Sequence, residues 1–297
     1  MFQDVDEDTG LPVAGGSCTI FANLLERATY LNRPHKREKN NASPSVPPAL
    51  RKRKANSMAG CSQWQPEKTS NVDKSNNDRI ILNSINETNP SFYQLLEASY
   101  ADQRTFLNNI LEAPSVLDIQ REWPVLFNKN AIKWHFNKLT GSNLDFLSEN
   151  LNNKAAKIVQ FGLNTKLINC IETENLNYQS LEVLSKYFKE DFSLLYYKFK
   201  YSTDIEEILK VNAPCIVEIE NKGTSVYLEK VKVTHCIHFT EALQVAFVLY
   251  FNMNLEYIKA ISTTLEMIQR YFLKIHPDSG TKSQKISSSK KSDWFNE

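Results

Sequence analysis

Apolar residues recur at intervals of three and four positions through most of the chain between residues 80 and 275. This spacing gathers them on one face of an α-helix, and Pro90 and Pro114 bound the first such segment. Gly141 follows a later segment, in the position where a helix often ends in a left-handed residue. The pattern predicts helical segments at 91–111, 115–127, 131–139, 144–151, 155–163, 178–187, 239–250 and 255–273.

The period of the pattern changes after Pro214. Residues 214–220 and 225–234 alternate apolar and polar positions, and a connection that includes Gly223 stands between them, which predicts a β-hairpin. Residues 239–250 are apolar nearly all round, so we expect that helix at the centre of its domain. The predicted fold class is therefore mostly α: a helical domain with one small β-hairpin at 214–234, preceded by a disordered leader.

Residues 119–136 hold a dense group of large apolar side chains around a single proline. Such density indicates the nucleus of a hydrophobic core, because these side chains gain most from leaving water. The residues predicted to form this core are Trp123, Pro124, Leu126, Phe127 and Trp134.

Composition divides the chain into three parts. Residues 1–79 are a largely disordered, basic leader, since few of them between 31 and 77 could bury enough apolar surface to offset the entropy of ordering. A short helix at 18–30 is the one element expected there. Residues 80–275 form the helical domain, and residues 276–297, rich in Ser and Lys, form a disordered tail.

The leader carries two basic groups separated by a proline-containing spacer. Their spacing resembles a bipartite nuclear localisation signal, because an extended cationic chain can lie in an acidic groove. A solvated run of charge is the alternative, and as a contact to DNA the same charges would be weak and blind to sequence. The candidate signal residues are Lys36, Arg37, Arg51, Lys52, Arg53 and Lys54.

Net charge and cysteine usage narrow the class of protein. Thirty-five Lys and Arg residues against 34 Asp and Glu give a net charge of +1, so the whole chain is no polycation for nucleic acid. Five widely spaced cysteines without a CxxC pair predict reduced thiols rather than disulfides. The acidic first residues and the short apolar run at 242–251 predict neither a secretory leader nor a membrane span. We therefore expect a nuclear protein, with the cytoplasm as the alternative.

Residues 60–66 (GCSQWQP), the phrase Trp123-Pro124-x-Leu126-Phe127 and residues 214–217 (PCIV) together resemble a known group of sequences. That group consists of uncharacterised animal proteins, abundant in fishes, that are described as similar to sterile alpha motif domain-containing protein 3. The resemblance covers about two thirds of the chain, roughly residues 60 to 275. The sterile alpha motif itself is not recognisable, so oligomerisation through it is not implied. The family supplies no catalytic residues.

Two histidine-containing segments were weighed as sites. His235, Cys236 and His238 are zinc-type ligands, but a strand places His235 and Cys236 on opposite faces, and a tetrahedral site needs further donors. A helix-entry segment with half-buried polar side chains is the favoured alternative. His135 would need an adjacent acid or nucleophile to act as a base, so a buried histidine with hydrogen-bonded ring nitrogens is expected.

Carboxylates and tyrosines offer two weaker patterns. The pairs Glu206-Glu207 and Glu218 with Glu220 suggest a hydrolase, although such pairs on helix faces and strands are usually solvated. Tyr196, Tyr197 and Tyr201, interleaved with Lys198 and Lys200, resemble a stacking surface for single-stranded nucleic acid. On a helix these tyrosines would spread around the cylinder, which favours packing.

These observations predict a non-enzymatic protein–protein interaction or scaffold protein that needs no cofactor or metal. Its partner would be a protein, with no membrane contact. The alternative is a nucleic-acid-associated factor derived from a mobile element, which would use the leader and the tail for weak phosphate contacts. The tail residues concerned are Lys282, Lys285, Lys290 and Lys291.

Overall fold

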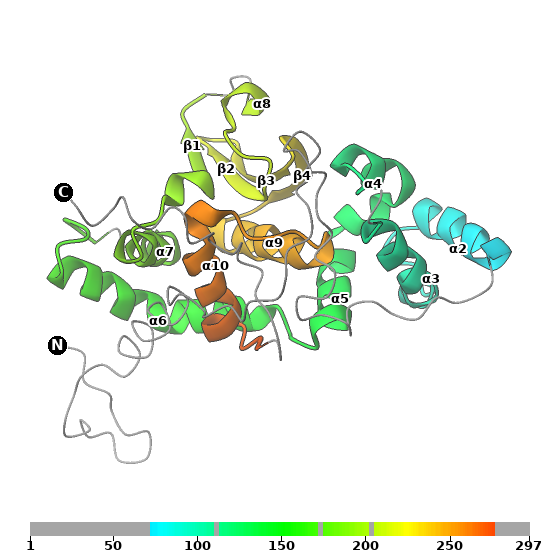
Figure 1. Ribbon diagram of the computed structural model, residues 1–297, viewed down its shortest axis with the longest axis horizontal. Helices are drawn as coiled ribbons and strands as arrows, with labels where there is room; N and C mark the ends of the chain where they lie inside the picture. Colours follow the sequence, from blue (N-terminus) through cyan, green and yellow to red (C-terminus); the bar gives the residue numbers. More distant parts are fainter. Residues whose placement is uncertain (1–71, 110–112, 172–174, 202–204, 277–297) are drawn as a thin grey trace, which may run out of the picture.

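The computed structural model describes residues 72–109, 113–171, 175–201 and 205–276 (Figure 1). The α-helices are α2 (Val72–Ser84), α3 (Phe92–Leu107), α4 (Val116–Glu122), α5 (Lys129–Thr140), α6 (Asp145–Asn164), α7 (Leu176–Tyr187), α8 (Ile205–Ile208), α9 (Phe239–Asn252) and α10 (Ser262–Met267). The strands are β1 (Tyr196–Phe199), β2 (Cys215–Ile219), β3 (Gly223–Leu228) and β4 (Val231–Cys236). Short 3-10 helices occupy η3 (Pro124–Phe127), η5 (Phe192–Leu194) and η6 (Lys259–Ile261), and η7 (Ile268–Phe272) is π-helical. The mostly α character of the domain is confirmed.

A four-stranded sheet in the order β1-β2-β3-β4 lies against α9 (Figure 1). β1 pairs with β2 in parallel, and the other two pairs are antiparallel. The sheet face that carries Tyr196, Ile216 and Val226 joins the main core together with α9. The opposite face carries Tyr197 and Val217 and closes a small second cluster with residues around α8. Both faces of the sheet are thus covered near its centre.

Helix α9 is buried on every side, as its apolar sequence predicts. It contacts the sheet on one side and helices α5, α6 and α7 on the others (Figure 1). A helix that is apolar all round is stable only when it is enclosed in this way. The sheet and the helical part of the domain therefore share this helix as their common core.

The predicted hairpin is wrong in its extent. Residues 225–234 form two strands rather than one, because the chain reverses at Glu229 and Lys230, where φ is 50° and 65°. Left-handed φ at two successive residues suits the tight turns of β-hairpins, where Asn and Gly are preferred. A Glu-Lys pair inside an alternating pattern carries no such signal. The sheet also gains β1, a segment for which the sequence analysis predicted no strand.

Two helical segments differ from their predicted extents. The segments 144–151 and 155–163 form the single helix α6, because its buried residues continue at helical spacing across the polar stretch between them. The segment 255–273 is instead divided into η6, α10 and η7. Glu190 contributes to the start of α10, since its carboxylate accepts hydrogen bonds from the amides of Thr263 and Thr264 at 2.6 and 2.8 Å.

The predicted core nucleus is only partly buried. Trp123 is 3 % exposed and Leu126 is buried, whereas Phe127 and Trp134 are half-buried. Pro124 is exposed, because it occupies the first position of η3, where its missing N–H costs no hydrogen bond. Gly141 ends α5 with a left-handed φ of 69°, as predicted.

The leader up to residue 71, with its candidate helix at 18–30 and the six candidate signal residues, lies outside the described residues, as does the tail from residue 277. Helix α2 begins at Val72 and runs through Arg79, the residue at which the sequence places the end of the leader. Among the described residues, no helix combines the length and the apolar character that crossing a bilayer requires.

Candidate functional site

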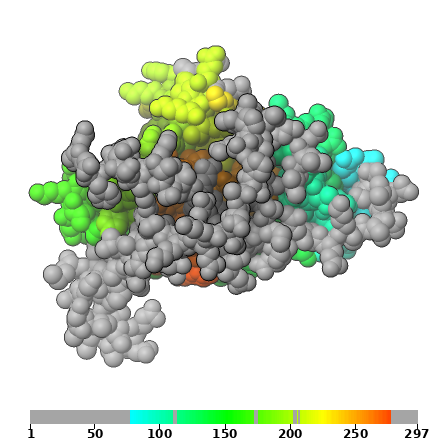
Figure 2. All heavy atoms as spheres, viewed as in Figure 1, coloured from blue at the N-terminus to red at the C-terminus, as the bar shows by residue number. Residues whose placement is uncertain are grey.

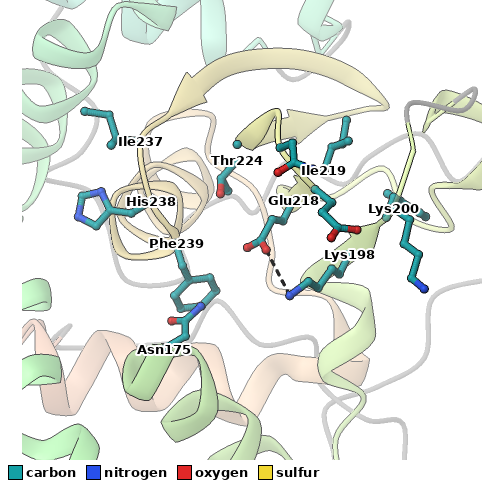
Figure 3. A pocket seen from close by; sticks show the side chains of 13 residues that line it. Asn175, Lys198, Lys200, Glu218, Ile219, Thr224, Ile237, His238 and Phe239 are labelled. Atoms are coloured by element: carbon teal, nitrogen blue, oxygen red, sulfur yellow. Dashed lines mark ion pairs between the residues drawn. The ribbon is translucent and has the colours of Figure 1, made fainter. Parts of the chain in front are cut away.

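An open cleft of about 760 Å³ lies where the sheet extends beyond the start of α9 (Figure 3). Three side chains, Lys198, Glu218 and Thr224, follow one another across β1, β2 and β3 in register on the face that looks toward α9. Residues 237–239 and Asn175, the N-cap of α7, form the opposite wall. In the space-filling view the residues of the sheet region project from the top of the molecule (Figure 2). The cleft is thus bordered by β1, β2 and β3 on one side and by the starts of α7 and α9 on the other.

Glu218 is the central acid of the cleft and is already engaged. The Tyr196 hydroxyl donates to its Oε2 at 2.6 Å, and Lys198 Nζ lies 3.4 Å from its Oε1 (Figure 3). Both oxygens of the carboxylate are therefore engaged by neighbouring side chains. Its arrangement favours a structural role in joining β1 to β2.

The start of α9 is not capped by a side chain. His238, in the N-cap position, makes no capping hydrogen bond, and Glu241 instead accepts from the amide of Ile237 at 2.6 Å. Burial acts to raise the pKa of Glu241, but the hydrogen bonds from Lys129 and from the Ile237 amide hold that pKa below its usual value. The first-turn amides of residues 239–241 have no hydrogen-bond acceptor among the described residues.

Thr224 places a hydroxyl group in the cleft. The residue is 3 % exposed, and no hydrogen bond of its hydroxyl occurs within the described part of the chain. Its oxygen points into the cleft, toward the segment at which α9 begins (Figure 3). This orientation makes the hydroxyl available as a donor to a group that enters the cleft.

The candidate zinc ligands are separated by the fold. Cys236 is fully buried in the main core, whereas His235 and His238 are exposed. Burial raises the pKa of the Cys236 thiol, and that of Cys215 on the other sheet face, to about 12. Among the described residues, no three His, Cys, Asp or Glu side chains gather as metal ligands. Thiols with raised pKa values are weak nucleophiles, because little thiolate forms near neutral pH.

His135 lies in a buried polar cluster between α3, α5 and the end of α9. Neither ring nitrogen has a hydrogen-bond partner at bonding distance, so the expected hydrogen-bonded histidine is wrong. Burial and the nearby Arg104 guanidinium lower its pKa to about 3, against a smaller opposing effect of the Asn252 side chain. Arg104 Nη1 donates to the Asn252 carbonyl at 2.7 Å. The cluster is enclosed and is separate from the cleft.

The tyrosine pattern is divided by the strand. Tyr196 and Tyr197 lie on opposite faces of β1, and Tyr201 is exposed beyond its end. They therefore form no continuous stacking surface. Glu220 lines the cleft and is exposed, in line with the solvated interpretation of that acid.

Sequence reasoning missed the cleft itself. Its lining combines residues from β1, β2, β3 and the start of α9, and only the register of the sheet brings them together. The one local signal is the alternation of Lys198, Phe199 and Lys200, which is typical of a strand.

Comparisons with known proteins find no match for this chain among protein-family models, curated proteins or solved structures. The resemblance to the proteins described as similar to sterile alpha motif domain-containing protein 3 therefore stays a prediction.

Proposed function

We propose that this chain is a non-enzymatic protein-binding module whose cleft beside the sheet receives a segment of another protein. The observation that carries the proposal is Ile237, which is 82 % exposed on the rim of the cleft. Phe239 at the start of α9 also lines the cleft, whereas the side chains of Phe199 and Ile219 pack in the second cluster on the opposite face of the sheet. Apolar side chains around an open cleft, mixed with polar groups, are typical of a peptide-binding surface.

The chemistry of the cleft supports binding rather than catalysis. Catalysis of acyl or phosphoryl transfer needs an activated nucleophile or a free base close to the reacting atom. Glu218 is held by Tyr196 and Lys198, and the nearest thiol, Cys236, is buried on the far side of Thr224 in the sheet register. The groups that line the cleft are arranged to make contacts.

A competition experiment in cell extract tests the proposal. A photoreactive amino acid replaces Glu220, which is exposed in the cleft, and the full chain is irradiated with an excess of unmodified competitor chain. We expect wild-type competitor to suppress the cross-linked protein adduct. The Ile237→Asp competitor should be about tenfold less effective, because burying a charge at an apolar contact costs more than 1 kcal/mol.

Leu117→Asp is the matched control, since Leu117 is also an exposed apolar residue, at 62 %, but lies on α4 away from the cleft. It should compete as well as wild type. Equal competition by Ile237→Asp and Leu117→Asp, or the absence of any protein adduct, would contradict the proposed interface.

We further propose that the basic leader carries the protein into the nucleus. Replacing Arg51, Lys52, Arg53 and Lys54 with glutamine is expected to move a fluorescent fusion of the full chain from nucleus to cytoplasm, because the acidic groove of an import receptor needs these charges. Glutamine at the four tail lysines Lys282, Lys285, Lys290 and Lys291 is the control with equal charge change. An unchanged distribution of the leader variant would contradict the proposed nuclear import through the leader.

A further inference from the structure

The uncapped start of α9 and the Thr224 hydroxyl both offer hydrogen-bond donors to the cleft. We propose that they bind a carboxylate of the partner, so that the segment received by the cleft is an acidic peptide. This inference rests on the proposed function and specifies the chemistry of the same site. It draws on two independent observations, the free amides of a long helix and a buried hydroxyl aimed at them.

The first observation is the helix start. The partial positive charge of a helix N-terminus and its unbonded amides favour a bound anion. In α9, which has 14 residues, the amides of Phe239, Thr240 and Glu241 have no acceptor in the part of the chain that the structure describes. The Glu241 carboxylate accepts hydrogen bonds from the amide of Ile237, which precedes the helix, and from Lys129, so it caps none of these three amides.

The second observation is Thr224. The residue is 3 % exposed, and its hydroxyl is directed into the cleft toward the start of α9 (Figure 3). An entering carboxylate would accept from this hydroxyl with one oxygen and from helix amides with the other. Hydrogen bonds to a charged acceptor are among the stronger ones in proteins.

The charged side chains of the cleft favour a peptide carboxylate over the phosphate backbone of a nucleic acid as its ligand. Lys200 lines the cleft without an ion pair among the described residues, so one cation is available, while Lys198 is shared with Glu218. Glu218 and Glu220 on the same strand segment would repel a polyanion more strongly than a single negative charge. The exposed side chain of Ile237 on the rim offers apolar contact area to a peptide, whereas a nucleic acid would be bound mainly through its phosphates.

Nuclear magnetic resonance titration of the full chain with defined probes tests the inference. The probe is an acetylated, amidated hexapeptide that carries a single aspartate among valine and threonine residues, and the reference is the same peptide with asparagine in place of that aspartate. We expect the aspartate peptide to shift the amide resonances of Phe239 and Thr240 and to bind about tenfold more tightly than the asparagine peptide. Thr224→Val, which keeps the side-chain shape, should weaken the aspartate peptide about tenfold.

Thr234→Val is the matched control, because Thr234 lies on the adjacent strand β4 and does not line the cleft. It should bind like wild type. Equal binding of the two peptides, no shift at the start of α9, or no effect of Thr224→Val would overturn the inference. Tighter binding of a single-stranded oligothymidylate at the same amides would overturn it in favour of phosphate. If the peptides fail while the Ile237→Asp competition succeeds, only the carboxylate is refuted and the protein-binding function stands.

Discussion

Replacing Trp123 with alanine is expected to lower the free energy of unfolding by about 3–5 kcal/mol. The indole is buried in the main core, and the Arg79 guanidinium lies 5.9 Å from the ring centroid. Its main chain joins two elements, donating to the Ile119 carbonyl at 2.7 Å and accepting from the Leu126 amide at 3.0 Å. Alanine keeps these backbone bonds, so the loss reflects the vacated volume. A domain of this size is stable by only about 5–15 kcal/mol in total.

Urea unfolding followed by circular dichroism measures this change, with Trp134→Ala as the matched control. Trp134 is half-buried and packs edge-on against Tyr100 at 5.8 Å, so its removal should cost clearly less. A Trp123→Ala variant that melts close to the wild-type temperature would show that Trp123 serves as a surface anchor. That result would transfer the candidate interface from the cleft to the junction of α4 and η3.

Lowering the pH is expected to destabilise the protein through His135. Its pKa is about 3 in the folded protein and about 6.5 in an unfolded chain, so between these pH values the unfolded state binds a proton that the folded state does not bind. Stability is therefore complete above about pH 6.5 and falls by up to about 1.4 kcal/mol per pH unit toward pH 3. Between about pH 7.5 and 5 this one residue should remove about 2 kcal/mol.

The variant His135→Leu isolates this contribution. The variant removes the ionisable ring together with its two buried nitrogens, which lack partners. Because leucine does not titrate, the free energy of unfolding of the variant should rise by about 2 kcal/mol relative to that of wild type when the pH falls from about 7.5 to 5. His235→Leu is the control, because it makes the same substitution at an exposed position on β4, outside the buried cluster around His135. Parallel pH profiles for wild type and His135→Leu would show that the ring is hydrogen-bonded or hydrated in solution.

The helical part of the fold could be predicted from the sequence because its signal is local. The caps at Ser115 and Asn128 and the left-handed Gly141 are set by neighbouring residues, and the apolar spacing identifies the buried helix faces. The sheet was predicted less well. β1 has only four residues, and its pairing with β2 depends on contacts across a connection that includes α8. Such short parallel strands carry no period that distinguishes them from a helix.

The candidate site could not be predicted, for a related reason. Lys198, Glu218 and Thr224 become neighbours only through strand register, which is fixed after three segments have paired. The unpartnered state of the Thr224 hydroxyl also has no sequence signature, since threonine is common in strands. The burial of His135 could be predicted from its apolar neighbours, but the burial of Arg104 beside it could not, because charged residues usually lie at the surface.

The enclosed position of α9 makes the order of synthesis matter. Within the residues that the structure describes, α9 is the last long helix, yet it supplies the inner surface for both the sheet and helices α5 to α7. A ribosome-bound chain must therefore have emerged as far as Asn252 before either half can close over its apolar residues. Until then these surfaces are available to chaperones, and premature termination ahead of Phe239 would leave both halves open together.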